Sequence, residues 1–207
     1  MTKIKICGLT NIDDAKQAVE LGADALGFIF ADSPRRITPE TTREIIISLP
    51  PFVSKVGVFV GEEPRNIQEI SDYCHLDFVQ LHGEKCWEYC DSISKPLIKA
   101  FAVKDRTVLD HIRSRHLQYF MLDTSHAHLH GGTGQTFDWQ IAKEASSMGK
   151  LILSGGLNPD NIIDALTIVR PYAVDINSGI EESPGVKDFG KMKQFIEEVK
   201  IWDSRMH

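Results

Sequence analysis

The sequence predicts an α/β protein that folds as a single, compact (β/α)8 TIM barrel with short loops. Strand-like and helix-like segments alternate along all 207 residues, which favours parallel strands connected by helices. Eight segments of each kind follow one another at a mean spacing of about 25 residues, and eight units are what closes this kind of barrel. Because such barrels can be as short as ~200 residues, one catalytic domain over residues 1–207 accounts for the sequence.

The individual elements follow from short apolar runs and amphipathic segments that lie between turn residues. Strands are predicted at residues 3–7, 25–30, 54–60, 77–82, 96–102, 118–123, 150–154 and 172–177. Helices are predicted at residues 12–21, 39–48, 65–73, 85–92, 106–115, 138–147, 159–168 and 188–200. Asn11, Thr38-Pro39 and Asn158-Pro159 are start signals for three of these helices. An open doubly wound sheet is the alternative, but it would use fewer strands and a GxGxxG turn where this sequence reads CGLTNI.

Composition narrows the classes of function. The formal net charge is −6 and no basic stripe is present, which argues against nucleic acid as a partner. No apolar run approaches the ~18 residues of a membrane span. The N-terminus enters an amphipathic strand with no signal-peptide pattern, and the four cysteines form no CxxC pair. We therefore expect a cytoplasmic protein in a reducing compartment.

Three strands end in ionisable side chains that residue parity directs into the barrel. Alternate side chains of a barrel strand face the lumen and the helices. Lys5 and Cys7 then face inward on the first strand, Gln80 and His82 on the fourth, and Asp123 on the sixth. A thiol, an imidazole and a carboxylate thus meet at the C-terminal mouth, where barrel enzymes build their active sites. This convergence indicates an enzyme.

Glycine-containing turns after the last two strands indicate a phosphate site. Gly155 and Gly156 follow the seventh strand, and Ser178 and Gly179 follow the eighth. Glycines allow the backbone N–H groups to approach an anion closely, and the loops after strands seven and eight are the usual phosphate site of this barrel. A sugar phosphate is the expected substrate. The glycine cluster at residues 131–134 lacks a P-loop lysine and is expected to be a loop over the pocket.

The chain resembles phosphoribosylanthranilate isomerase, the single-domain barrel enzyme of tryptophan biosynthesis. The resemblance extends from residue 3 to about 190 and keeps the order of the family's motifs. These are KICGLT, GADALGFIF followed by SPR, KVGVFV, VQLHGE, LDT followed by GGTG and FDW, SGGLNPDN, and VDINSGIE followed by GVKD.

The resemblance implies an Amadori rearrangement of N-(5-phosphoribosyl)anthranilate that needs no metal and no redox cofactor. It assigns the general base to Cys7 and the general acid to Asp123. It assigns the anthranilate carboxylate to Arg35, although the adjoining Arg36 leaves that choice open, and it places His82 in the site. The remaining substrate contacts fall to Gly155, Gly156, Asp175, Ser178 and Gly179.

The proposed chemistry sets opposite requirements for the two catalytic groups. A base needs the pKa of Cys7 to fall toward neutrality through nearby positive charge, and Lys5 is one candidate source. An acid needs the pKa of Asp123 to rise through desolvation.

Several alternatives stay open at this point. His126, His128 and His130 form an HxHxH pattern that extended backbone would align as zinc ligands. The related isomerase of histidine biosynthesis would need a second phosphate site and an aspartate in place of Cys7. A barrel that binds sugar phosphates without catalysis is the third alternative. The sequence is compatible with either a monomer or a homodimer.

Overall fold

Eight parallel strands close into one barrel in the computed structural model, which describes residues 1–83, 92–115, 117–124 and 136–206. Sequence neighbours pair all the way round, and β1 pairs with β8 to close the ring. The strands are β1 (Lys3–Ile6), β2 (Ala25–Ile29), β3 (Ser54–Val60), β4 (Phe78–His82), β5 (Leu97–Val103), β6 (Tyr119–Thr124), β7 (Lys150–Leu153) and β8 (Ala173–Ile176). The predicted barrel is confirmed, and each strand boundary lies within one residue of its predicted position.

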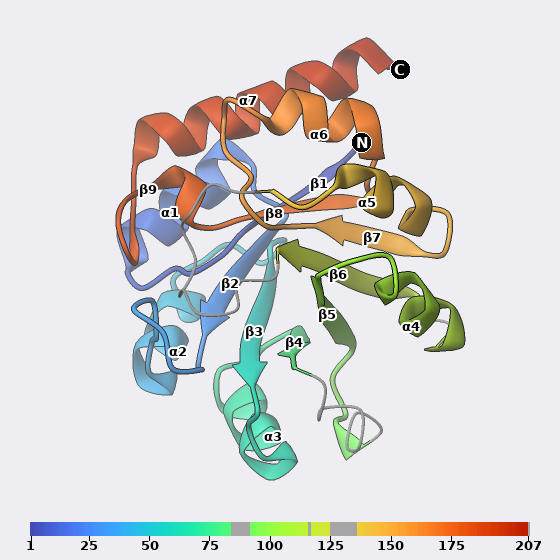
Figure 1. Ribbon diagram of the computed structural model, residues 1–207. Coiled ribbons are helices and arrows are strands. Elements are labelled where there is room, and N and C mark those ends of the chain that lie inside the picture. The colour runs from blue at the N-terminus through green and yellow to red at the C-terminus, as the bar shows by residue number, and fades with distance from the viewer. Residues whose placement is uncertain (84–91, 116, 125–135, 207) are drawn as a thin grey trace.

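The helices lie outside the strands, as Figure 1 shows. They are α1 (Ile12–Leu21), α2 (Pro39–Ile47), α3 (Pro64–Tyr73), α4 (Val108–Arg115), α5 (Trp139–Ala145), α6 (Ile162–Val169) and α7 (Phe189–Met206). Asn11 caps α1 and Thr38 caps α2 through side-chain oxygens that accept backbone N–H groups, as predicted. The helix predicted at 85–92 falls almost entirely outside the described residues.

Two predicted helix boundaries differ from the structure by three residues or more, for identifiable reasons. Helix α6 begins at Ile162 instead of Pro159, because the Asn158 side chain accepts the N–H groups of Asp160 and Asn161 and holds them in a turn. Helix α7 continues six residues beyond its predicted end at residue 200. Asp203 in this extension accepts two hydrogen bonds from Thr2, so the last turns pack against the start of the chain.

A short segment after β8 has no counterpart in the sequence prediction. A 3-10 turn, η3 (Ser178–Ile180), leads into the antiparallel pair β9 (Glu181–Ser183) and β10 (Val186–Lys187). This hairpin carries two buried charged side chains, Glu181 and Lys187, to the neighbourhood of the barrel mouth.

The core has two parts, divided by the barrel wall. Outward-facing strand residues, among them Ile6 and Phe120, pack against the helices in the larger cluster. Inside the barrel lies a smaller cluster made of Val56, Ile98, Ala100, Met121, Ile152 and Ala173. The predicted parity of strands β1 and β6 is therefore confirmed. This smaller apolar cluster fills the middle of the barrel, and polar side chains line the barrel mouth. In the parts of the chain that the structure describes, no helix is both long and apolar enough to cross a bilayer.

The contact between Asp203 and Thr2 gives a stability prediction. Asp203 is buried, and its carboxylate accepts the Thr2 backbone N–H at 2.7 Å and the Thr2 hydroxyl at 3.0 Å. Replacing Asp203 with Ala should lower the free energy of unfolding by about 2 kcal/mol, because charge-assisted hydrogen bonds to a buried carboxylate are lost. Urea denaturation at neutral pH measures this change. Glu197→Ala, an exposed change on the same helix, is the control, and equal effects in both variants would contradict the assignment.

Candidate active site

A cavity of about 440 Å³ lies where the C-terminal ends of the strands meet. It contains eight of the nine site residues predicted from the sequence. These are Cys7, Arg35, His82, Asp123, Gly155, Gly156, Asp175 and Ser178. Arg36 is exposed and does not line the cavity, so of the two arginines the structure places Arg35 there.

Gly179 is the predicted residue that the lining of this cavity does not include. It lies against the loop after β7, where an added Cβ would collide with the carbonyl oxygen of Leu157. Gly179 therefore lets the loops after β7 and β8 pack against each other, and Ser178 beside it borders the cavity.

Cys7 stands where β1 ends and the backbone turns away. Its N–H donates to the Ile176 carbonyl at 2.8 Å, which holds the residue in line with the strand. Gly8 then adopts a φ of 71°, and an added Cβ there would lie 2.5 Å from Asn177 Oδ1. Beside it on β2, a Cβ on Gly27 would lie 2.6 Å from the Cys7 Sγ. Gly27 thus makes the space for the thiol, and Gly8 lets Asn177 approach the turn that follows it.

A buried ion pair lies beside the thiol. Lys5 Nζ donates to Asp175 Oδ1 at 2.6 Å, and Ser154 Oγ donates to Asp175 Oδ2 at 3.1 Å. Burial opposes the charged ammonium, but the Asp175 carboxylate and Cys7 outweigh that effect and raise the pKa of Lys5. Lys5 therefore stays protonated next to Cys7.

The pKa of Cys7 is raised, which corrects the expectation that Lys5 would lower it. Burial is the largest cause, because a thiolate that is shut off from water loses its hydration. Lys5 acts in the predicted direction, but Asp175 offsets part of its field. Without ligand, Cys7 is therefore held as the neutral thiol.

His82 is held in the neutral form. Burial is the main cause, and the positive charges of Lys5 and Lys99 add to it, so that the pKa of His82 falls to about 4. The Gln80 Nε2 lies 2.7 Å from the His82 Nε2. The Gln80 amide and the His82 ring nitrogen are thus within hydrogen-bond distance, a contact that a neutral imidazole can make.

Asp123 borders the cavity at the end of β6. Its side chain is partly buried, and Oδ1 accepts the Thr124 N–H at 2.8 Å. Gly155 approaches it closely, since a Cβ on Gly155 would lie 2.9 Å from Asp123 Oδ1. The glycine loop after β7 therefore touches the strand end that carries the carboxylate.

The loops after β7 and β8 present unused backbone donors. Gly155 and Gly156 adopt φ values of 87° and 68°, which favour glycine. The Asn161 Nδ2 donates to the Gly156 carbonyl at 2.8 Å and ties this loop to α6. Within the described residues, the N–H groups of Gly155, Gly156 and Ser178 donate no hydrogen bond. Unpaired N–H groups at the edge of a cavity are a typical anion site.

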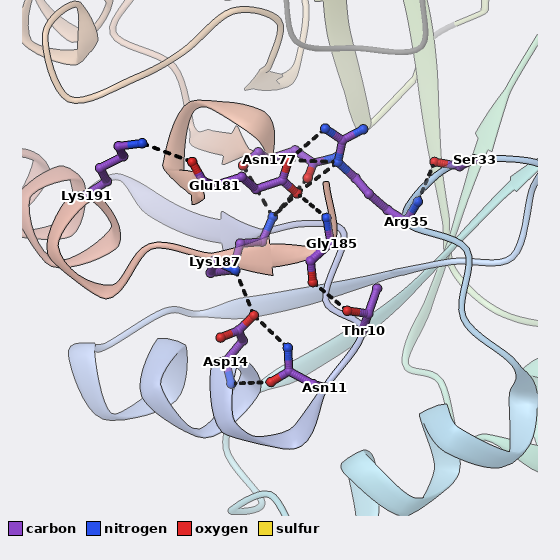
Figure 2. A network of polar contacts seen from close by, with 10 residues as sticks. All are labelled: Thr10, Asn11, Asp14, Ser33, Arg35, Asn177, Glu181, Gly185, Lys187 and Lys191. Carbon is purple, nitrogen blue, oxygen red and sulfur yellow. Dashed lines mark hydrogen bonds and ion pairs between the residues drawn. The ribbon is translucent and has the colours of Figure 1, made fainter. Parts of the chain in front are cut away.

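Arg35 has partners that sequence reasoning missed. The side chain is buried, and its guanidinium binds the carboxylate of Glu181, which Lys187 also contacts (Figure 2). Both partners lie in the stretches NSGIE and GVKD that carry the resemblance, and that was the only signal for them.

The zinc alternative is not tested by the structure. His126, His128 and His130 lie outside the described residues, as does the glycine cluster at residues 131–134. Among the residues that the structure does describe, no group of three or more His, Cys, Asp or Glu side chains is placed to hold a metal ion.

The neutral state of His82 gives a pH prediction. Since its pKa in the folded protein is about 4 and that of an unfolded histidine is ~6.5, the unfolded chain binds more protons between these values. The contribution of His82 to stability should therefore be complete above ~pH 6.5 and lost as the pH falls toward 4. Nitrogen-15 NMR of the ring should show a neutral imidazole and no titration of His82 between pH 8 and about 5.5. A midpoint near 6.5 would contradict the assignment.

Comparison with known proteins finds relatives from one family. The family model described as "N-(5'phosphoribosyl)anthranilate (PRA) isomerase" matches residues 4–198. The N-(5'-phosphoribosyl)anthranilate isomerase of Geobacter sulfurreducens (strain ATCC 51573 / DSM 12127 / PCA) is 48% identical over 203 residues, which cover 98% of this chain and 100% of that protein.

Solved structures extend the likeness to three dimensions. The crystal structure of phosphoribosyl anthranilate isomerase from Thermotoga maritima has a TM-score of 0.90 and 44% identity, and the match covers 97% of this chain and 99% of that one. A phosphoribosyl anthranilate isomerase in complex with reduced 1-(o-carboxyphenylamino)-1-deoxyribulose 5-phosphate has a TM-score of 0.87 and 42% identity, with the same coverage. The chain therefore belongs to the N-(5'-phosphoribosyl)anthranilate isomerase family.

Proposed function

We propose that Cys7 and Asp123 are the base and the acid with which this chain performs its family's reaction. That reaction is the Amadori rearrangement of N-(5'-phosphoribosyl)anthranilate in tryptophan biosynthesis. The observation that carries the proposal is the position of the two side chains. Both line one cavity, and strands β7 and β8 separate β6 from β1, so a sugar between them meets the acid and the base from different sides.

The two groups suffice for the proton transfers of the reaction. Asp123 in its protonated form gives a proton to the ribose ring oxygen. The C1–O bond then breaks, and the anilino nitrogen forms an iminium with C1. Cys7 as thiolate removes the C2 proton, whose bonding electrons form the C1–C2 double bond and neutralise the nitrogen. The resulting enolamine moves the hydroxyl proton from O2 to C1 and settles as the ketone, so the rearrangement is redox-neutral overall.

Because the pKa of Cys7 is raised, substrate binding must help the thiol to lose its proton. The thiol must lose its proton before it can act as a base, and the adjacent ammonium of Lys5 favours the thiolate. Because Lys5 is fixed by Asp175 on the neighbouring strand, its charge is already in place before the substrate arrives. The pair therefore supplies a preorganised field at the reacting carbon.

The rest of the cavity matches the two charged ends of the substrate. Unpaired N–H groups of Gly155, Gly156 and Ser178 are proposed to bind the phosphate. Gly179 allows the two loops that carry these groups to pack against each other. Arg35 is proposed to hold the anthranilate carboxylate through its planar guanidinium. Asp175 and His82 border the space between these ends and are proposed to contact the sugar.

The other functions considered from the sequence receive less support. The histidine-pathway isomerase would require an aspartate where this chain has Cys7, and family membership favours the tryptophan-pathway substrate. A non-catalytic binder would have no need for both Cys7 and Asp123 at the cavity, and both are there. Binding of a product analogue without turnover is the result that would favour the binder.

Location and assembly are part of the proposal. The composition and cysteine pattern support a cytoplasmic enzyme whose partner is its small-molecule substrate, with no nucleic acid or membrane partner. A Thermotoga maritima relative is described as dimeric, and monomers have been generated from it. A monomer or a homodimer is therefore proposed for this chain.

Activity of strand-end variants tests the assignment. N-(5'-phosphoribosyl)anthranilate generated in situ should lose its fluorescence when the wild-type protein is added. Cys7→Ser and Asp123→Asn should each lower the rate by ~10²-fold or more, because each removes a positioned acid or base. Cys74→Ser, a change at a buried cysteine outside the cavity, is the control and should keep most of the activity. A wild-type protein that binds a product analogue but shows no turnover would contradict the proposed function.

The pH dependence of the Asp123→Asn variant tests Cys7 independently. The acid and the base titrate in opposite directions in the wild type, whereas this variant retains only the base. Since kcat/KM reports the free enzyme and the pKa of Cys7 is raised there, we expect the residual kcat/KM of this variant still to be climbing at about pH 8.5, the ordinary pKa of a thiol. A limb that levels off near pH 6 to 7 would mean that a different group is the base.

A further inference from the structure

Arg35 is held by one carboxylate through three hydrogen bonds. Its Nε donates to both oxygens of Glu181, at 2.8 and 3.0 Å, and its Nη2 donates to Glu181 Oε2 at 2.7 Å. Figure 2 shows the guanidinium lying against this carboxylate, with Nε and one terminal nitrogen turned toward it. Within the described residues Nη1 donates no hydrogen bond, so it is available to a ligand in the cavity that Arg35 lines.

Lys187 holds the carboxylate from the other side. Its Nζ donates to Glu181 Oε1 at 3.0 Å and to the Asn177 side-chain oxygen at 2.9 Å, and the Lys187 side chain is fully buried. The Gly185 N–H adds a further bond to Glu181 Oε1 at 3.2 Å. Glu181 therefore cannot turn away from Arg35 without breaking contacts with the hairpin formed by β9 and β10.

The charges in this cluster do not balance. Arg35 and Lys187 are two cations around a single carboxylate, so the cluster has one net positive charge when all three are ionised. Burial opposes ionisation of Glu181, but Arg35 and Lys187 outweigh it and lower its pKa. Burial lowers the pKa of Lys187, and Glu181 opposes that shift. One ligand carboxylate at Arg35 would neutralise the excess charge.

Glu181 and Lys187 can affect a ligand in the cavity only indirectly. Neither lines it, whereas Arg35 and Asn177, which they hold, both do. Their effect on a ligand must therefore pass through Arg35 or Asn177. The cluster also packs on the turn after Cys7, since a Cβ on Gly8 would lie 2.9 Å from Arg35 Cδ.

We infer that Glu181, braced by Lys187, is a positioning residue that turns the free edge of Arg35 toward the carboxylate of the anthranilate ring. The inference rests on the proposed function, because it takes the substrate from there. Without this brace, the long Arg35 side chain would sample other rotamers and its hydrogen bonds to the ligand would carry an ordering cost.

Two probes that differ only in the carboxylate test the inference. One is reduced 1-(o-carboxyphenylamino)-1-deoxyribulose 5-phosphate, and the other is the same compound with an unsubstituted phenyl ring. Calorimetry gives Kd for each, and their ratio measures how strongly the protein recognises the carboxylate. The wild type should prefer the carboxylated probe by about 10- to 100-fold, as expected for a charge-assisted hydrogen bond.

The variants separate positioning from simple structural damage. Glu181→Gln should reduce the wild-type preference by about tenfold or more while Kd for the unsubstituted probe stays nearly constant. Glu181→Asp keeps the charge but shortens the side chain, so its preference for the carboxylated probe should lie between those of the wild type and of Glu181→Gln. Glu182→Gln, the same change at the exposed neighbouring residue, should keep the wild-type ratio.

A double variant guards against a failure to fold. Glu181→Gln leaves two buried cations without a carboxylate, which can be strongly destabilising. Glu181→Gln combined with Lys187→Met removes one charge of each sign, keeps the net charge of the cluster, and should still lose the carboxylate preference. Circular dichroism confirms that each variant is folded before Kd is measured.

The outcomes distinguish the two proposals. Equal weakening of both probes in the Glu181 variants, or an unchanged ratio in the double variant, would overturn the positioning role. A wild type that binds both probes equally would overturn it too, because Arg35 would then not recognise a carboxylate. A wild type that discriminates but shows no turnover would leave the positioning role intact and reject only the proposed reaction.

Discussion

The ion pair between Lys5 and Asp175 is the contact on which the active site depends. The two residues are register partners on β1 and β8, the first and last strands of the barrel, and both are buried. A buried pair of this kind contributes little net stability, because desolvation offsets most of the attraction, but removing one partner costs about 3–5 kcal/mol. The pair therefore fixes the register between β1 and β8, and that register places the thiol of Cys7 beside a fixed positive charge.

The barrel and the direction of its strand-end side chains could be read from local sequence. Period-two alternation and turn residues located every strand within one residue, and the same parity directed Cys7, His82 and Asp123 into the mouth. These features depend on neighbours along the chain. The start of α6 was mispredicted because Asn158 competes for the first N–H groups, a choice between two local hydrogen-bonding patterns that composition does not decide.

Features that depend on distant parts of the chain could not be predicted. Arg35 and Glu181 are 146 positions apart, and nothing near either residue indicates the other. The pKa of Cys7 is a similar case, because its direction follows from the balance between burial and the field of Lys5. The sequence identifies Cys7 and Lys5, but the balance between burial and charge depends on how closely the surrounding residues pack against them. Gly27 sets that closeness, because a Cβ there would collide with the Cys7 Sγ and crowd the Lys5 Nζ.

The distribution of charge explains how an acidic chain favours a small anion. The formal net charge of −6 belongs to the whole sequence, whereas the buried cluster that holds Arg35 against the cavity has two cations, Arg35 and Lys187, and one carboxylate, Glu181. The pair of Lys5 and Asp175 is neutral as a unit, and His82 is uncharged. The lining also includes the carboxylates of Asp32 and Asp123, so anion binding falls to Arg35 and to the N–H groups of the glycine loops and not to the cavity as a whole. Because the buried cations are shielded less by salt than surface charges, discrimination between substrates should rest on them and not on the acidic exterior.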